Sequence, residues 1–358
     1  MHDRDVVSDG KVATGPWRPG WPTRLRVPAA LQGNGRSLGL LIVMLALITI
    51  VAIDNPRYVS VDNLRVISLQ MAFIGIASVG TTFLLITGNV DLSIGSMYAL
   101  AAVLSAILAR DIPIPLALAT GVLVAGAVAF VNGALTWRIK ISPLIITLGT
   151  MILLRGIVLL STHGYGVTGV PESFGGLAQT QPFGVPMPVI ALIVVAVAAF
   201  VILQFTTIGR HLYAVGGNRE ASAAAGLKVR RLVLGVFIVS GLLVGLAGIL
   251  AASRYGSPDP SYGVGFELDV ITAVILGGVA FSGGEGGVGG VILAVALLTV
   301  ITSGFVSLGI DPYYAYVVKG TILIVAVAAD QIVQEQRERH QKSLAMREHA
   351  RAEELERA

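Results

Sequence analysis

The stretch TTIGRHLYAVGGNREASAAAGLKVRR, residues 206–231, is the longest polar and positively charged interruption in a chain that is otherwise almost continuously apolar. Asn218 is a favourable N-cap, Glu220 lies in the first turn, where negative charge suits the helix dipole, and Gly226 is placed to end the helix. The pattern therefore predicts a helix of about two turns over 218–226. Because so short a helix is marginal in water, it needs a surface to dock on, either its own membrane domain or a partner.

The apolar sequence on both sides of this stretch indicates the fold class. Charged residues make up 13% of the chain and hydrophobic residues 54%, whereas soluble proteins carry about 25% charged residues. Apolar runs recur at close to the length of about 20 residues that crosses a bilayer. We therefore expect an all-α polytopic membrane protein in the lipid bilayer, with about ten transmembrane helices, some of them short re-entrant or half-helix segments. The expected spans are 38–53, 66–87, 92–109, 114–136, 143–161, 186–205, 232–252, 268–282, 286–307 and 313–329.

The distribution of basic residues predicts the orientation. If the N-terminus is cytoplasmic, nineteen of the 25 Lys and Arg residues fall in cytoplasmic segments and four in outer loops, in keeping with the positive-inside rule. Ten spans with both termini in the cytoplasm are therefore favoured. The expected parts are a disordered tail over 1–37, a transmembrane domain over 38–330 and a charged cytoplasmic tail over 331–358, suited to a solvated helix. The long outer segment 162–185 is expected to form a re-entrant or capping loop.

Few ionisable residues fall within the expected spans. Arg155, Asp269 and Lys319 lie inside them and Asp91 lies at an edge. A charge at mid-membrane costs about 2.5 to 3.5 kcal/mol, so such residues either serve function or extend to an interface. Ion-driven transporters usually carry carboxylates or histidines at the midplane, and the expected spans place none there. This disfavours a secondary transporter and indicates an external source of energy.

Two glycine-rich segments interrupt the apolar pattern. In ITGNVDLSIGSM, residues 86–97, Asp91 can cap the next helix, while Gly88 and Gly95 permit turns at membrane depth. Irregular backbone is tolerated at membrane depth only where protein or water covers it. The alternative interpretation of this segment is an ordinary tight turn between two spans. The second segment is LGGVAFSGGEGGVGG, residues 276–290. It follows no strand and contains no basic residue, so we expect a close-packed turn at the cytoplasmic side and not a nucleotide loop.

Motifs of catalysis and of cofactor binding are missing from the sequence. There is no GxxxxGK[ST] phosphate loop, no HExxH and no cluster of histidines, and the chain has no cysteine. We expect neither catalytic residues nor a metal site nor a bound cofactor. The net charge of +4 marks orientation in a membrane protein, so nucleic acid is not an expected partner.

Four ordered motifs resemble one family, the permease subunits of ATP-binding-cassette importers in their ribose-type sugar branch. They are GNVDLSIGSMYAL (88–100), ITLGTMILLRGIVLL (146–160), IGRHLYAVGGNREASAAAGLKV (208–229) and ELDVITAVILGGVAFSGGEGGVGG (267–290). The resemblance covers about residues 60–330. It implies a type II importer-like fold in the bacterial plasma (inner) membrane and transport of a sugar, with a monosaccharide favoured, by alternating access.

The resemblance also implies partners and site residues. The partners are cytoplasmic ATPase subunits that use ATP and Mg²⁺, an extracytoplasmic sugar-binding protein and a second permease copy, the same or different. The residues similar to the family's coupling helix are Gly216, Gly217, Asn218, Glu220, Ala221, Ser222 and Gly226, with Ser222 replacing the usual Ala. Candidates for the substrate pathway or for gating are Asn89, Asp91, Ser93, Gly95, Arg155 and Asp269.

Two alternatives to a sugar permease remain open. The nearest is a permease for branched-chain amino acids or another small solute, although the GNVDLS and TLGTM strings favour the sugar branch. The other, from a different class, is an ion-coupled secondary transporter or a channel. It predicts uptake without any ATPase.

Overall fold

The computed structural model describes residues 34–139 and 141–357, which form helices joined by loops and contain no β-strand. Residues 1–33 of the tail expected over 1–37 lie outside the described residues, as do positions 140 and 358. The helices are α1 (Asn34–Asp54), η2 (Pro56–Val59), α2 (Val61–Ile86), α3 (Ile94–Leu108), α4 (Ile114–Ile139), α5 (Pro143–Thr162), η3 (Glu172–Gly175), α6 (Gly176–Gln179), η4 (Pro182–Gly184), α7 (Met187–Phe205), α8 (Thr207–Gly217), α9 (Arg219–Ala224), α10 (Val229–Tyr255), α11 (Phe266–Leu276), α12 (Val288–Ser307) and α13 (Tyr314–Arg357).

The polytopic membrane fold is confirmed. Within the described part of the chain, eight helices are long and apolar enough to cross a bilayer: α1, α2, α4, α5, α7, α10, α12 and the first 23 residues of α13. The other two expected spans, 92–109 and 268–282, are too short, since α3 has 15 residues and α11 has 11. They are half-helices of the expected kind.

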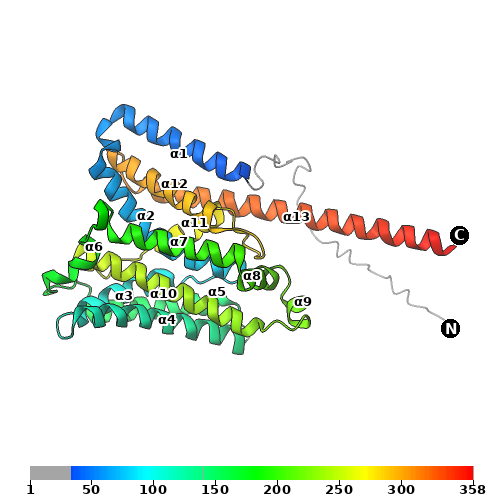
Figure 1. The fold of residues 1–358 in the computed structure, drawn as a ribbon, viewed down its shortest axis with the longest axis horizontal. Coiled ribbons are helices and arrows are strands. Elements are labelled where there is room, and N and C mark those ends of the chain that lie inside the picture. Colours follow the sequence, from blue (N-terminus) through cyan, green and yellow to red (C-terminus); the bar gives the residue numbers. More distant parts are fainter. Residues whose placement is uncertain (1–33, 140, 358) are drawn as a thin grey trace, which may run out of the picture.

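The boundaries of both expected tails shift in the structure. The first helix, α1, begins at Asn34, inside the segment expected to be a tail. At the other end, α13 continues without a break to Arg357, well past the expected boundary at 330. Figure 1 shows this helix projecting beyond the others, at the end of the molecule that carries α8 and α9. We call this end the α9 end and the opposite one the α6 end.

The centre of the bundle is α2, whose apolar window is 89% buried. It contacts α7, α10, α11 and α12, while α1 packs on α12 at the edge (Figure 1). The most extensive packing between two helices is that of α4 with α10, where small residues let the backbones approach. A Cβ on Gly241 of α10 would lie 2.4 Å from the Cβ of Ala129 and 2.7 Å from the carbonyl oxygen of Ala125 in α4. Larger residues would therefore separate these helices.

The half-helices follow two segments that enter the membrane-crossing part without forming helix. Residues 87–93 enter from the α9 end and precede α3, and residues 257–265 enter from the α6 end and precede α11. The first turn of α3 meets the second segment, because a Cβ on Gly95 would lie 2.4 Å from the Gly263 carbonyl oxygen and one on Gly263 would lie 2.0 Å from that of Gly95. Gly263 also has a φ of +79°, which favours glycine. We call this contact the crossing.

The expected capping loop packs on the α6 end of α10. Ser253 Oγ accepts a hydrogen bond from the Ala178 amide at 3.0 Å and donates one to the Phe174 carbonyl at 2.7 Å. The Phe174 side chain is fully buried. These contacts make the segment around η3 and α6 a packed cap and not a re-entrant loop.

Candidate coupling site and polar residues within the membrane

The helix predicted over 218–226 is confirmed as α9, together with its two ends. Asn218 Oδ1 accepts a hydrogen bond from the Ala221 amide at 2.8 Å. At the other end, Gly226 has a φ of +84°, and the Leu227 amide bonds to the Ser222 carbonyl at 3.1 Å, which makes a Schellman motif. Local sequence therefore determines both ends of α9.

The surface of α9 is divided between two sides. Glu220, Ala221 and Gly226 are exposed, so this side is free in the single chain. Ser222, expected in the same docking set, is instead 6% exposed and faces the chain's own fold. Its small size therefore serves internal packing.

Sequence reasoning missed a second helix, α8, directly before α9. Thr206 Oγ1 caps it by accepting from the Gly209 amide at 3.2 Å. Its buried residues are Gly209, Leu212 and Val215. This i, i+3, i+6 spacing is the pattern of a half-buried helix and was the available signal.

The C-terminal end of α8 joins both glycine-rich segments. A Cβ on Gly216 would lie 1.8 Å from the Ile86 carbonyl oxygen, where α2 ends. That oxygen accepts a hydrogen bond from the Gly284 amide at 2.8 Å. Tyr213 Oη donates to the Gly286 carbonyl at 2.7 Å. The turn expected in 276–290 is therefore close-packed, and α8 is fastened to it.

Arg219, which the sequence did not single out, extends this junction to the first segment. Its Nη2 lies 3.3 Å from both the Thr87 carbonyl oxygen and Asn89 Oδ1. Burial lowers the pKa of the guanidinium, but arginine remains protonated in proteins. Of the pathway candidates, Asn89 thus belongs to the contact with α9.

The segment 87–93 continues into a buried polar network. Asp91 Oδ1 accepts from the Ser93 amide at 2.7 Å and from Ser93 Oγ at 2.5 Å. Asn132 Nδ2 donates to Ser93 Oγ at 3.0 Å, and Thr150 Oγ1 donates to Asn132 Oδ1 at 2.7 Å. Asp91 and Ser93 are fully buried, so these two candidates face protein. Asn132 and Thr150 were missed, although polar residues within apolar spans are a usable signal.

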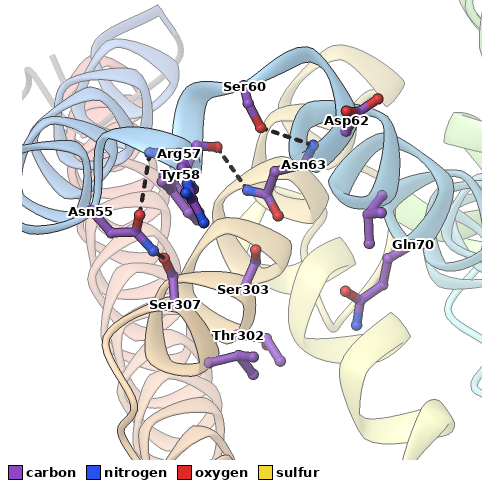
Figure 2. A pocket seen from close by; sticks show the side chains of 12 residues that line it. Asn55, Arg57, Tyr58, Ser60, Asp62, Asn63, Gln70, Thr302, Ser303 and Ser307 are labelled. Carbon is purple, nitrogen blue, oxygen red and sulfur yellow. Dashed lines mark hydrogen bonds between the residues drawn. The ribbon is translucent and has the colours of Figure 1, made fainter.

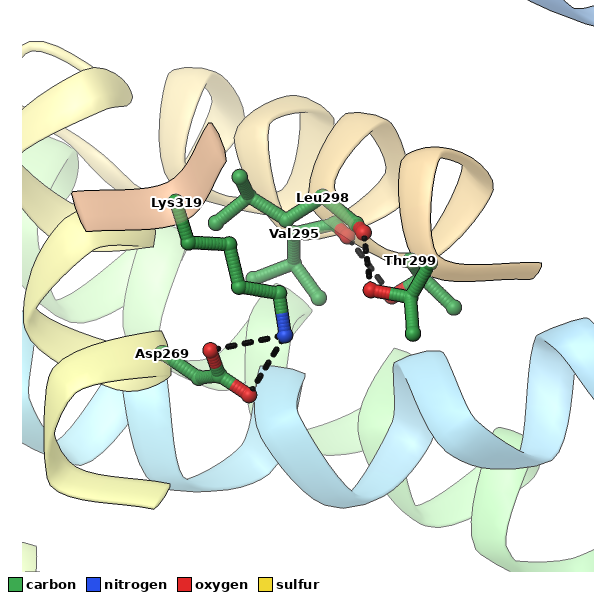
Figure 3. Close-up of polar contacts among 6 residues, drawn as sticks. Asp269, Val295, Leu298, Thr299 and Lys319 are labelled. Carbon is green, nitrogen blue, oxygen red and sulfur yellow. Dashed lines mark hydrogen bonds and ion pairs between the residues drawn. The ribbon is translucent and has the colours of Figure 1, made fainter. Parts of the chain in front are cut away.

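The remaining charged candidates have partners within the chain. Arg155 Nη1 donates to the carbonyls of Pro260 and Tyr262, each at 3.0 Å, and so holds the segment 257–265. Asp269 pairs with Lys319 at 2.8 Å (Figure 3). These hydrogen bonds and this ion pair explain how the charges are accommodated within the bundle.

One carboxylate lies deeper in the bundle than its place between the expected spans 232–252 and 268–282 indicated. Glu267 was placed in an outer loop, but the preceding segment descends into the bundle and α11 begins at Phe266. The 11 residues of α11 span about 16 Å, roughly half of a 30 Å hydrocarbon core. Glu267 Oε2 is buried without a hydrogen-bond partner and lies 2.1 Å from where a Cβ on Gly95 would be. Glu267 therefore sits at the crossing.

Two cavities lie away from the crossing. One of about 590 Å³ at the α6 end, between η2, α2 and α12, is lined by polar side chains such as Asn55, Arg57 and Gln70 (Figure 2). The other, of about 1020 Å³, lies at the α9 end between α1, α13 and the segment 276–290. At its edge Arg36 bonds to the carbonyls of Ile275 and Leu276 at the end of α11. Among the described residues, no group of three or more His, Asp or Glu is placed to hold a metal ion.

Comparison with known proteins gives one family and several relatives. The family model described as "Branched-chain amino acid transport system / permease component" matches residues 63–327. The ribose import permease protein RbsC of Escherichia coli strain K12 is 36% identical over 295 residues, covering 81% of this chain and 92% of the relative. The L-arabinose ABC transporter permease protein AraH of Azospirillum brasilense is 36% identical over 321 residues, covering 88% and 95%. The D-allose transport system permease protein AlsC of E. coli K12 is 33% identical over 298 residues, covering 82% and 91%. No solved structure matches the chain.

Proposed function

This chain belongs to the family of branched-chain amino acid transport system permease components, and on that premise we propose that it is the membrane-spanning subunit of an ATP-binding-cassette importer for a monosaccharide. The main support for this proposal is the sequence identity of 33 to 36% with sugar permeases over at least 81% of the chain. That likeness favours a sugar over a branched-chain amino acid or another small solute as cargo.

The exposed side of α9 is the proposed entry point for energy. Separate ATPase subunits would bind ATP and Mg²⁺, and this chain would neither catalyse hydrolysis nor bind a cofactor itself. Support comes from the free surface at Glu220, Ala221 and Gly226 and from the fastening of α8 and α9 to both glycine-rich segments. A helix that moved with the ATPase would pull on both segments together.

Alternating access follows from where these segments lead. Asn89 lies in the segment that precedes half-helix α3, and Gly286 lies in the segment that follows half-helix α11. Half-helix α3 meets the segment that leads into half-helix α11 at the crossing, between Gly95 and Gly263. Because packed helices move as rigid units, a shift of α8 and α9 would move both half-helices and switch the side from which the path is open.

The assembly would sit in the bacterial plasma (inner) membrane with both termini and the α9 end in the cytoplasm. The basic residues of the loop 206–231 support this orientation. An extracytoplasmic sugar-binding protein would then dock on the α6 end, and a second permease copy would complete the path. Glu267 at mid-membrane keeps an ion-coupled transporter as the second candidate, because such carriers use midplane carboxylates.

Reconstitution distinguishes these functions. The chain, its ATPase and its binding protein are placed in vesicles, and uptake of ribose, arabinose, allose and leucine is measured with and without ATP. We expect ATP-dependent uptake of at least one sugar and none of leucine. Leucine uptake alone, or uptake without the ATPase driven by an ion gradient, would overturn the proposal.

The docking role of α9 has its own test. Glu220→Ala and Gly226→Trp should reduce ATPase association or separate ATP hydrolysis from uptake, while membrane insertion is retained. Gly235→Trp is a suitable control, because a Cβ on Gly235 meets no atom within 4 Å and the residue lies in α10. Normal coupling in Gly226→Trp would contradict the role.

A further inference from the structure

The ionisable residues within the membrane-crossing part gather around one half-helix. Apart from Asp91 in its buried network, they are Arg155 of α5, Glu267 and Asp269 of α11, and Lys319 of α13 among the described residues. Arg155 bonds to the segment before α11, and Lys319 pairs with Asp269 (Figure 3). Charged residues at this depth almost always face the bundle interior or a water-filled cavity, because lipid cannot solvate them.

The exposed side of α11 lies between two of these charges. Successive residues of a helix are rotated by about 100° about its axis. Leu268 therefore points in a direction between those of Glu267 and Asp269. Val264 lies about one turn before Leu268, on the same side. Leu268 is 51% exposed and Val264 is 63% exposed. Tyr316 of α13 borders this side, 3.6 Å from where a Cβ on Gly265 would be. We call the surface formed by α5, the segment 257–265, α11 and the start of α13 the polar wall.

Glu267 differs from the other charges of the polar wall because one of its oxygens is buried without a hydrogen-bond partner. Arg155 Nη1 is shared by two carbonyls, and Asp269 and Lys319 bond to each other. Glu267 Oε2 has no partner, and an unpaired buried acceptor is unfavourable by about 1 to 3 kcal/mol or more. A carboxylate has about four acceptor positions, which suit the hydroxyl groups of a neutral polyol.

We propose that the polar wall lines the path of the cargo and that Glu267 accepts hydrogen bonds from the hydroxyl groups of a polyhydroxylated cargo at mid-membrane. This inference rests on the proposed sugar-import function. Arg155 is a positioning residue, since it holds the segment that leads into α11, the helix that carries Glu267. A single wall encloses no path, so a second permease subunit supplies the other side.

The location of the path is tested by measuring how fast a water-soluble reagent modifies thiols introduced at single positions. The chain has no cysteine, so each variant carries a single thiol. Val264→Cys and Leu268→Cys are compared with Leu123→Cys in α4 and Ile193→Cys in α7, which are 64% and 54% exposed in the single chain. A charged, membrane-impermeant methanethiosulfonate should react with the wall positions at least tenfold faster in the assembled importer. Equal rates, or faster reaction of the controls, would overturn the location.

The role of Glu267 is tested by Glu267→Gln and Glu267→Asp, with Glu172→Gln in the exposed cap as control. We expect Glu267→Gln to lower the maximal rate of sugar uptake about tenfold while ATP hydrolysis is still stimulated by loaded binding protein. A purely structural role would lower assembly and hydrolysis together. Glu267→Asp should restore part of the uptake.

The two proposals fail in different ways. If the wild-type importer takes up no sugar in the presence of ATP, the proposed function fails. If wild type takes up sugar and Glu267→Gln matches it, only the assignment of Glu267 is overturned.

Discussion

Two segments enter the membrane-crossing part without forming helix, and they differ in how fully the polar groups in and beside them are hydrogen-bonded. In 87–93, Asp91 and Ser93 are fully buried and hydrogen-bonded to each other and to Asn132. In 257–265 the backbone carbonyls are held by the half-buried Arg155, and the next residue with a carboxylate, Glu267, keeps an unpaired oxygen. A satisfied network rigidifies its surroundings, whereas an unsatisfied group favours another arrangement. The first segment is therefore a fixed frame and the second the adjustable one.

The largest effect is expected at the crossing, where α3 touches the segment 257–265. Gly95→Ala places a Cβ 2.1 Å from Glu267 Oε2 and 2.4 Å from the Gly263 carbonyl oxygen, so the crossing must separate, at a cost of about 3 kcal/mol. The thermal unfolding temperature in detergent should fall and uptake should be lost. Gly149→Ala in α5 has open space around it and should leave the unfolding temperature unchanged or slightly raised. Equal stability of the two variants would show that α3 and this segment do not meet.

The frame should lose stability when its network is broken. Asn132→Leu removes donors and acceptors from Ser93 Oγ and Thr150 Oγ1 and should cost about 2 kcal/mol, because the groups left behind stay buried and unpaired. Thermal unfolding measures this. Thr120→Val, at a partly exposed site whose hydroxyl bonds to the Leu116 carbonyl of its own helix, is the control and should change stability little. A fully stable Asn132→Leu protein would mean that the network is not needed.

The adjustable segment should lose function more than stability. Arg155→Gln removes the two hydrogen bonds to Pro260 and Tyr262 at a cost of about 1 kcal/mol, since each bond is only partly shielded from water. Uptake should fall further than this small change in unfolding temperature would explain. Unaltered uptake would show that 257–265 does not depend on Arg155.

The smallest effect is expected at the link between the frame and α9. Arg219→Gln replaces the guanidinium with a shorter side chain, so the hydrogen bonds to Thr87 and Asn89 at 3.3 Å are lost. Long hydrogen bonds of this kind contribute about 0.5 kcal/mol to stability. We expect normal stability and a few-fold rise in ATP hydrolysed per sugar imported, measured in vesicles. Arg230→Gln, on the exposed start of α10, should leave this ratio unchanged. The same rise in both variants would show that the loss of a positive charge, and not the loss of the contacts of Arg219, changes the ratio.

Sequence patterns predicted the features that depend on local chemistry. The long apolar runs become membrane-crossing helices, and Asn218 and Gly226 begin and end α9, because caps and hydropathy act within a few residues. The depth of Glu267 could not be predicted in this way. An apolar run such as 268–282 reads the same whether it crosses the bilayer or stops halfway, and only the path of the preceding backbone distinguishes these cases. Likewise, no local signal paired Asp269 with Lys319, fifty residues away.

The central position of α2 has a consequence for synthesis at the ribosome. Its neighbours α7, α10, α11 and α12 all follow it in the chain, so α2 enters the bilayer long before the surfaces that bury it exist. During that time Ser78, Thr81 and Thr82, all fully buried in the finished fold, face lipid or the insertion machinery. Contacts so distant in sequence form slowly. In a chain that stops before α10, most of the helices that bury α2 are missing and its polar side chains stay exposed to lipid. Truncated chains of this kind are therefore expected substrates for membrane proteases.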